Sequence, residues 1–291
     1  MATESETPSV HDPFDGDRFV SRFNVLGEFQ ATVNGRSILP SAAKPRQLLA
    51  LMAMRPNNVL PVDLLIEELW GSEQPASFKT TLQTYVLQIR RKISEAMAPD
   101  SCHAKKILMT RYRGYVLRIP SEMTDAWQFQ QLARAGLEHL YAGRIEVAAT
   151  TLASARSSWR GDPLADVDAG VSLSMEISRL NETYRCVTEG WVEAELRRRN
   201  HLGVLGEIAS LRIQDPLNEF FCGAQIAALY DLGRTSDALE TFRVMSKRLD
   251  HELGVLPSPY LANLHGSILR GAPVNDQWAR SKYFDRTGAA S

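Results

Sequence analysis

The segment TLQTYVLQIRRKI, residues 81–93, carries two sets of side chains that both recur at helical spacing. Because an α-helix turns by about 100° per residue, Leu82, Val86 and Ile89 point in one direction. Hydroxyl, amide and guanidinium groups lie on or beside the opposite face, at Thr80, Thr84, Gln88 and Arg91. These groups can hydrogen-bond to the base edges of DNA. No carboxylate occurs between Phe78 and Glu95, so phosphates would not be repelled.

A second basic element lies in TRYRGYVLRIP, residues 110–120. Residues 107–109 and 115–117 are typical of two strands, and residues 111–114 of the turn between them. The tip of this predicted hairpin carries two arginines and Tyr112. An arginine-rich hairpin can reach a phosphate ridge or enter a minor groove.

A small antiparallel sheet is expected ahead of these two elements. FNVLG (residues 23–27), FQATVNG (29–35) and RSILP (36–40) are short β-type runs. The second run ends in Asn34-Gly35, which strongly favours a hairpin turn.

Two more helices are predicted between this sheet and the helix described above. The first has Pro45 in its first turn and ends before Pro56. The second has Asp63 as its expected N-cap and Gly71 at its end. The third then begins with Ser77 as its expected N-cap. Three helices followed by a basic hairpin indicate a winged helix, whose third helix can enter a major groove about 12 Å wide.

The charge of the chain is distributed unevenly. Residues 22–120 contain 14 Lys and Arg against 7 Asp and Glu, a net charge of +7. Residues 1–21 and 121–291 each have a net charge of −4, which gives −1 for the whole chain. A basic module of this size favours a polyanionic partner, although charge alone also fits a solvated surface.

Each of these features has a plainer interpretation when it is taken singly. A polar helix face of Thr, Gln and Arg is typical of solvent-exposed surface, and so is a basic hairpin tip. The helix order, the acid-free third helix, the basic hairpin and the net charge nevertheless all agree with one another. Together they favour binding to double-stranded DNA.

The second half of the chain is predicted to be helical from Asp125 onward, without strands. A short pattern occurs twice, 90 residues apart: Gly143-Arg144 with Ala148 and Leu152, and Gly233-Arg234 with Ala238 and Phe242. The unit between them, near residues 191–211, is degenerate. Such helix pairs are similar to tetratricopeptide units, which stack into surfaces that bind proteins. The turn WRGDPLADV, residues 159–167, is expected to anchor Trp159 in the core.

The sequence contains no motif for catalysis, metal binding or nucleotide binding. Its six histidines form neither HExxH nor HxH, and no phosphate-binding glycine loop or GxSxG elbow occurs. Cys102, Cys186 and Cys222 are widely spaced, which favours a reducing cytoplasm over disulfides or zinc. No apolar run reaches about 18 residues, and the acidic N-terminus is unlike a secretory signal. We therefore expect a cytoplasmic, nucleoid-associated protein that is not an enzyme and has no cofactor or metal.

Six segments resemble the SARP family, bacterial activators of antibiotic biosynthetic clusters. Three are similar to its OmpR-type winged helix: LLALMAMRPNNVLPVDLLIEELWG, TLQTYVLQIRRKI and TRYRGYVLRIP. Three are similar to its bacterial transcriptional activation domain: WRGDPLADV, DPLNEFFCGAQIAALYDLGRTSDALETF and LDHELGVLPSPYLANLHGSILRG.

The resemblance implies a mostly α fold with two domains. An N-terminal winged helix-turn-helix of mixed α/β structure is expected over residues 22–120, and an all-α tetratricopeptide-like activation domain over 121–271. Residues 1–21 are expected to form a disordered N-terminal tail, and residues 272–291 a C-terminal tail.

The family pattern implies that the third helix lies in the major groove and that the hairpin is the wing. The candidate base-contacting residues are Lys79, Thr80, Thr84, Gln88 and Arg91. The candidate contacts to the DNA backbone or minor groove are Lys44, Arg46, Ser77, Arg90, Arg111 and Arg113. Lys44 and Arg46 are included because the N-terminus of the first helix favours anions.

The resemblance also implies partners. It implies tandem direct repeats near the −35 element of a promoter, together with RNA polymerase holoenzyme, through sigma region 4 and the C-terminal domain of the α subunit. Direct repeats require a head-to-tail homodimer on DNA, because a two-fold dimer reads inverted half-sites. Two alternatives stay open: a protein-interaction scaffold with only nonspecific DNA affinity, and a repressor of the same fold. The sequence does not specify the operator, the regulated pathway or an effector.

Overall fold

The computed structural model describes residues 21–97 and 104–274, which form two compact units. Unit 1 comprises the described residues up to Trp127 together with Trp159–Ser178, and unit 2 comprises the remainder. The sequence predicts one boundary near residue 120, whereas the structure groups residues 159–178, here called the strap, with the N-terminal unit. The two predicted tails lie almost wholly outside the described residues.

Unit 1 begins with an antiparallel sheet of β1 (Ser21–Asn24), β2 (Gln30–Val33) and β3 (Arg36–Ser37), in that order. Asn34 and Gly35 join β2 to β3 with φ angles of 49° and 75°. These positive values are what an Asn-Gly hairpin turn requires, so the predicted turn is confirmed.

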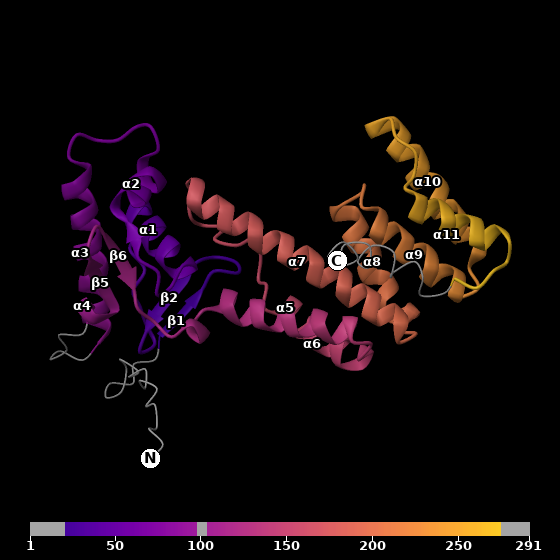
Figure 1. Ribbon diagram of the computed structural model, residues 1–291, viewed down its shortest axis with the longest axis horizontal. Coiled ribbons are helices and arrows are strands. Elements are labelled where there is room, and N and C mark those ends of the chain that lie inside the picture. The colour runs from indigo at the N-terminus through magenta and orange to yellow at the C-terminus, as the bar shows by residue number, and fades with distance from the viewer. Residues whose placement is uncertain (1–20, 98–103, 275–291) are drawn as a thin grey trace, which may run out of the picture. The chain divides into compact units, whose positions relative to one another are not determined.

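The three helices of unit 1 follow in the predicted order: α1 (Ala43–Met54), α2 (Val62–Trp70) and α3 (Phe78–Ala96). A second sheet has the order β4-β6-β5 and consists of β4 (Leu60–Pro61), β6 (Gly114–Leu117) and β5 (Leu108–Arg111). Figure 1 shows α3 beside the β5–β6 hairpin. This arrangement is the predicted winged helix.

One strand was missed, and two local predictions are wrong. Strand β4 was not predicted because it has only two residues, too few for a periodic pattern. Pro61 rather than Asp63 is the N-cap of α2, since the paired strand β4 ends there and Asp63 falls in the first helical turn. Ile107 ends a short helical turn, α4 (Ala104–Ile107), so the hairpin starts one residue later than predicted.

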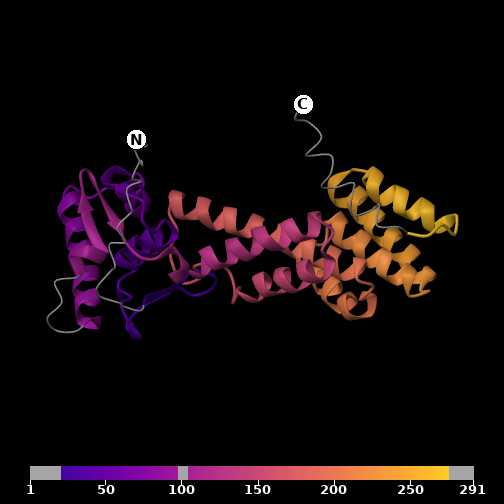
Figure 2. The ribbon, with the colours of Figure 1, turned by 60° about the horizontal axis from the view of Figure 1, so that its bottom comes forward.

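The described part of the chain after the 3-10 turn Ser121–Met123 contains helices and no strand, as predicted. These helices are α5 (Asp125–Tyr141), α6 (Ile145–Ser157), α7 (Val171–Arg197), α8 (His201–Gln214), α9 (Glu219–Asp231), α10 (Thr235–Leu253) and α11 (Pro259–Leu269). In unit 2, α8, α9, α10 and α11 pack consecutively, as Figures 1 and 2 show. The predicted fold class, a winged helix followed by an all-α domain, is confirmed.

The predicted repeat is visible as one turn geometry that occurs four times among the described residues of unit 2. The last is at Gly271, whose φ is 67° and whose successor, Ala272, donates its N–H to the Ser267 carbonyl oxygen. Gly143 and Gly233 have φ angles of 73° and 77°, and the next residue of each turn donates its N–H to a carbonyl five positions back. The turn between α7 and α8 has the same hydrogen bond from Asn200, but Arg199 takes the glycine position with a φ of 62°. This substitution explains why the middle unit is degenerate in sequence.

We expect Gly233→Ala to lower the free energy of unfolding by about 1 kcal/mol, because a Cβ is disfavoured at this left-handed φ. Gly206→Ala is the matched control. Gly206 lies exposed within α8, and an added Cβ would meet no atom within 4 Å. There alanine should instead raise the stability, by up to about 1 kcal/mol. Urea unfolding followed by circular dichroism measures the stability of both variants. Equal effects of Gly233→Ala and Gly206→Ala would show that the left-handed φ at Gly233 does not matter for stability.

Among the described residues, no helix has the length and apolar character needed to cross a membrane.

Candidate nucleic-acid interface

Helix α3 is divided into a buried and an exposed side. Its buried residues are Leu82, Val86, Ile89, Ile93 and Ala96. The five candidate base-contacting residues, Lys79, Thr80, Thr84, Gln88 and Arg91, are all exposed. The helix is therefore held by one side, and the other side presents donors and acceptors to solvent.

Two of these exposed side chains make hydrogen bonds along the helix. The Thr84 hydroxyl donates to the Thr80 carbonyl oxygen at 3.0 Å, so its oxygen retains acceptor capacity. Arg91 Nε lies 3.0 Å from Glu95 Oε1, but the Arg91 side chain is 82% exposed. An ion pair this exposed contributes little stability, and the guanidinium is free to exchange Glu95 for another acceptor.

The wing places Arg111, Tyr112 and Arg113 at its exposed tip. Tyr112 is 89% exposed, and the Arg113 guanidinium lies 5.6 Å from the centre of its ring. The Arg113 carbonyl oxygen accepts from the Val62 N–H at 2.9 Å, which ties the tip to the start of α2. A groove of about 440 Å³ is lined by residues of α2, α3 and the wing: Val62, Asp63, Lys79, Leu82, Gln83, Arg113 and Tyr115. Lys79 of α3 and Arg113 of the wing therefore open onto one groove, which the Asp63 carboxylate also lines.

Arg90, a candidate contact to the DNA backbone or minor groove, connects α3 to the wing. Its Nε donates to the Leu108 carbonyl oxygen at 2.9 Å, and its Nη2 donates to the Thr110 hydroxyl at 2.9 Å. Burial lowers the pKa of Arg90 from its ordinary value, while Tyr115 partly offsets this effect. Arg90 thus fixes strand β5 against α3.

The remaining candidates lie at the starts of helices. Ser77 is the N-cap of α3 as predicted, but its side chain makes no capping hydrogen bond. Lys44 is half-buried at the start of α1, and its Nζ is 3.3 Å from Gln47 Oε1. Arg46 Nη1 pairs with Asp166 Oδ2 of the strap at 3.0 Å, and its Nε donates to the Pro40 carbonyl oxygen. These contacts make Arg46 a link to the strap.

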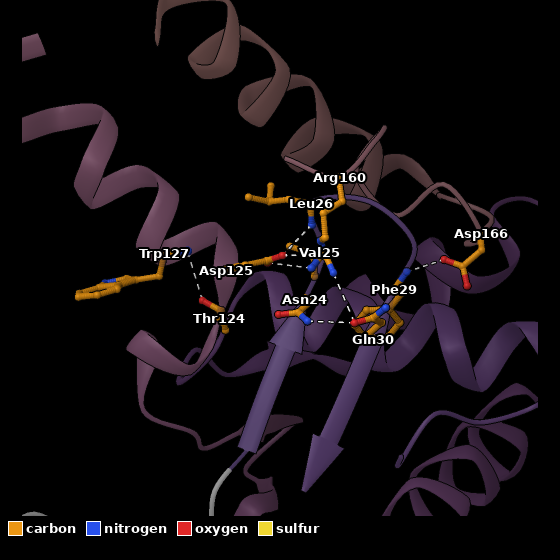
Figure 3. A network of polar contacts seen from close by, with 10 residues as sticks. All are labelled: Asn24, Val25, Leu26, Phe29, Gln30, Thr124, Asp125, Trp127, Arg160 and Asp166. Atoms are coloured by element: carbon orange, nitrogen blue, oxygen red, sulfur yellow. Dashed lines mark hydrogen bonds and ion pairs between the residues drawn. The ribbon is translucent and has the colours of Figure 1, made fainter. Parts of the chain in front are cut away.

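Asp125 and the strap enclose the loop between β1 and β2 (Figure 3). The Asp125 carboxylate accepts the N–H groups of Val25 and Leu26 at 2.8 and 3.1 Å, and pairs with Arg160 at 2.9 Å. Burial raises the pKa of Asp125, although the backbone donors and Arg160 favour its charged form. The loop's last backbone donor, Phe29 N–H, bonds to Asp166 at 2.7 Å.

Glu68 of α2 provides a second attachment of the strap. Its carboxylate is buried and accepts the backbone N–H groups of Gly170, Ser172 and Leu173 at 2.8, 2.8 and 3.2 Å. Ser172 and Leu173 lie in the first turn of α7, and Gly170 directly precedes the helix, so a side chain of α2 caps α7. Arg55, just after α1, also pairs with Glu176 of α7 at 2.9 Å.

Three acidic residues of this region were not predicted from the sequence. Glu68, Asp125 and Asp166 are ordinary acids in helical or turn patterns, and the backbone N–H groups that their carboxylates accept lie 99 to 137 residues away in sequence. Leu164, rather than the half-buried Trp159, is the buried anchor of the turn at the start of the strap. Over the described residues, no group of three or more His, Cys, Asp or Glu side chains could hold a metal ion.

Family models match both halves of the chain. The model of the bacterial transcriptional activator domain matches residues 124–269. The model of the C-terminal domain of transcriptional regulatory proteins matches residues 37–117. The strap therefore lies within the activator-domain match but belongs to the compact unit of the winged helix.

Individual proteins match along most of the chain. Regulatory protein DnrI of Streptomyces peucetius is 42% identical over 257 residues, which cover 88% of this chain and 94% of DnrI. Transcriptional regulator RedD of Streptomyces coelicolor is 30% identical over 271 residues, 92% of this chain and 76% of RedD. A solved structure of Mycobacterium tuberculosis EmbR in complex with a low-affinity phosphopeptide superposes with a TM-score of 0.83 at 27% identity, and the match covers 93% of this chain and 70% of EmbR.

Proposed function

This chain belongs to the SARP family of DNA-binding transcriptional activators, and we propose that it reads a specific promoter sequence with the exposed side of α3. One observation carries the proposal: Thr80, Thr84, Gln88 and Arg91 share the exposed side of a helix whose other side is buried, and Lys79 is exposed at the edge of that side, in the first turn. A helix held in this way can enter a major groove. The wing, fixed to α3 by Arg90, would then meet the adjacent backbone or minor groove.

We further propose that the target is a pair of direct repeats near the −35 element of a promoter that controls an antibiotic or other secondary-metabolite gene cluster. Direct repeats would be bound by two copies in head-to-tail order. The helical domain would recruit RNA polymerase through sigma region 4 and the C-terminal domain of the polymerase α subunit. In this proposal the protein acts in the cytoplasm and has no enzymatic activity.

The test uses the full chain, because a fragment ending near residue 121 would lack Asp125 and the strap, both parts of unit 1. Selection from random duplexes should enrich a repeated motif. Fluorescence anisotropy with that duplex and a scrambled one, at two salt concentrations, then measures specificity. A clear preference at both salt concentrations supports sequence readout, whereas equal affinities that collapse with salt would favour the scaffold alternative. Transcription in vitro with purified polymerase separates an activator from a repressor.

We expect Arg91→Ala to weaken discrimination between the selected and scrambled duplexes by about 1–3 kcal/mol, because a bidentate contact to a base would be lost. Lys44→Ala, at the start of α1, should weaken binding to both duplexes alike and lower the salt slope by about one. Anisotropy titrations at several salt concentrations measure both variants. If Arg91→Ala discriminated between the two duplexes as well as the wild type does, Arg91 would not contact a base.

A further inference from the structure

The exposed side of α3 contains one leucine, Leu87, which cannot hydrogen-bond to base edges as its polar neighbours can. Leu87 is 60% exposed, and within α3, all of which is described, the other leucine, both isoleucines and the valine are buried. Thr84 precedes Leu87 by three positions and Arg91 follows it by four, so both are its neighbours on the helix surface. The isopropyl group of Leu87 therefore lies among the candidate base-contacting side chains.

The backbone position of Leu87 is well fixed. Val86 beside it and Ile89 two residues later are 1% and 0% exposed. Leu87 is therefore preorganised, and the helix need not become ordered when a partner binds to this side of α3.

The neighbours of Leu87 restrict the kind of surface that can cover it. Thr84, Gln88 and Arg91 would be buried together with the leucine, and each needs a hydrogen-bond partner when it loses water. An apolar protein patch would satisfy Leu87 and leave these groups unpaired. The major groove of DNA instead offers acceptors and donors beside one apolar group, the C5-methyl of thymine.

We propose that Leu87 is a specificity-determining residue that recognises a thymine methyl group in the major groove. This role rests on the proposed sequence readout by α3. It specifies that the position of Leu87 selects thymine. Leucine has no donor or acceptor, so only the methyl distinguishes thymine from uracil in this contact.

The experiment removes the methyl group without altering base pairing. In the duplex enriched by the full-length protein, each thymine is replaced in turn by deoxyuridine, and affinities are measured by fluorescence anisotropy. For the wild-type protein, at least one replacement should weaken binding by about three- to tenfold, as expected for the loss of a buried methyl contact.

The variant Leu87→Ala supplies the second half of the test. It should bind the original duplex about as weakly as the wild type binds the uracil duplex, and the same uracil replacement should no longer affect it. Leu87→Met, which keeps an apolar side chain of similar volume, should retain most of the sensitivity. Because Leu87 is exposed, thermal unfolding of all three proteins should coincide.

The possible outcomes separate this inference from the proposed function. If no sequence is enriched, readout by α3 and the role of Leu87 both fail. If a sequence is enriched but no uracil position matters, or if Leu87→Ala keeps the wild-type sensitivity, only the role of Leu87 is overturned. Loss of transcription activation by Leu87→Ala with unchanged DNA affinity would also overturn it, and would point to a protein contact instead.

Discussion

Glu68→Ala should lower the local free energy of opening at the start of α7 by about 3 kcal/mol, because it leaves one buried and two part-buried backbone donors without their acceptor. Glu68 is 3% exposed, and its two carboxylate oxygens accept three N–H groups, from Gly170, Ser172 and Leu173. The carboxylate also offsets the positive end of the α7 dipole. Alanine cannot replace either contribution.

The close fit around Glu68 prevents an easy rearrangement. A Cβ added to Gly170 would lie 2.3 Å from the Glu68 carbonyl oxygen, so the strap backbone directly contacts α2. Gln47 Nε2 donates to the same carbonyl oxygen at 2.8 Å and lies 3.2 Å from the carboxylate. Removing the carboxylate therefore also leaves Gln47 with one partner fewer, inside a site that water does not reach easily.

Hydrogen-exchange mass spectrometry of peptides that cover residues 168–178 measures the effect directly. About 3 kcal/mol corresponds to exchange that is faster by roughly a hundredfold. Glu67→Ala is the matched control, because Glu67 is the exposed neighbour of Glu68 in α2 and should change stability by less than about 0.5 kcal/mol. The exchange rate of Glu68→Gln should fall between those of the two alanine variants. Its amide keeps one acceptor oxygen, but its NH₂ group would face the backbone N–H donors. Equal exchange in the two alanine variants would refute the capping role.

The capping has a functional consequence. The strap belongs in sequence to the matched activator domain, yet it folds as part of unit 1 with the winged helix. The contacts of Glu68, Arg55 and Asp166 thus make the start of α7 part of the body that carries α3. A variant that frees the strap should weaken DNA binding even though it changes none of the candidate DNA-contacting residues.

The sequence predicted the parts of the fold that depend on local patterns. The buried stripe of α3 recurs at helical spacing, and Asn34-Gly35 specifies its turn by φ alone, so both follow from short segments. The repeat in unit 2 was visible because a Gly-Arg pair marks two of its turns. Where Arg199 replaces glycine, the geometry persists but the signal disappears.

The contacts that complete unit 1 could not be predicted in the same way. Arg46 and Arg90 remain candidate DNA contacts, but nothing in the sequence indicated the contacts they make within unit 1. Which partner an arginine selects depends on tertiary neighbours, here Asp166 for Arg46 and the β5 backbone for Arg90. Periodicity also cannot separate the buried Glu68 from the exposed Glu67, since both fit an amphipathic helix.

The wing depends on one glycine in a comparable way. A Cβ added to Gly114 would lie 2.3 Å from the Leu60 carbonyl oxygen and 2.9 Å from its carbon, both backbone atoms. Gly114 is the first residue of β6 and pairs with Pro61 of β4 and Arg111 of β5. A side chain there must push β4 and β6 apart, and the Val62 N–H would lose its bond to Arg113.

We therefore expect Gly114→Ala to cost about 3 kcal/mol of stability and to reduce specific DNA affinity by at least about tenfold, because overpacking against backbone cannot be relieved by a rotamer change. Urea unfolding and anisotropy with the selected duplex measure the two effects. Gly206→Ala makes the same chemical change in open space and should leave DNA affinity unaltered. Arg111→Ala, on the exposed tip, should weaken binding without loss of stability. If Gly114→Ala weakened DNA binding without loss of stability, as expected for Arg111→Ala, the close packing of the wing against β4 would not contribute to stability. If it bound DNA normally despite being destabilised, the wing would not need a fixed position to contact its target.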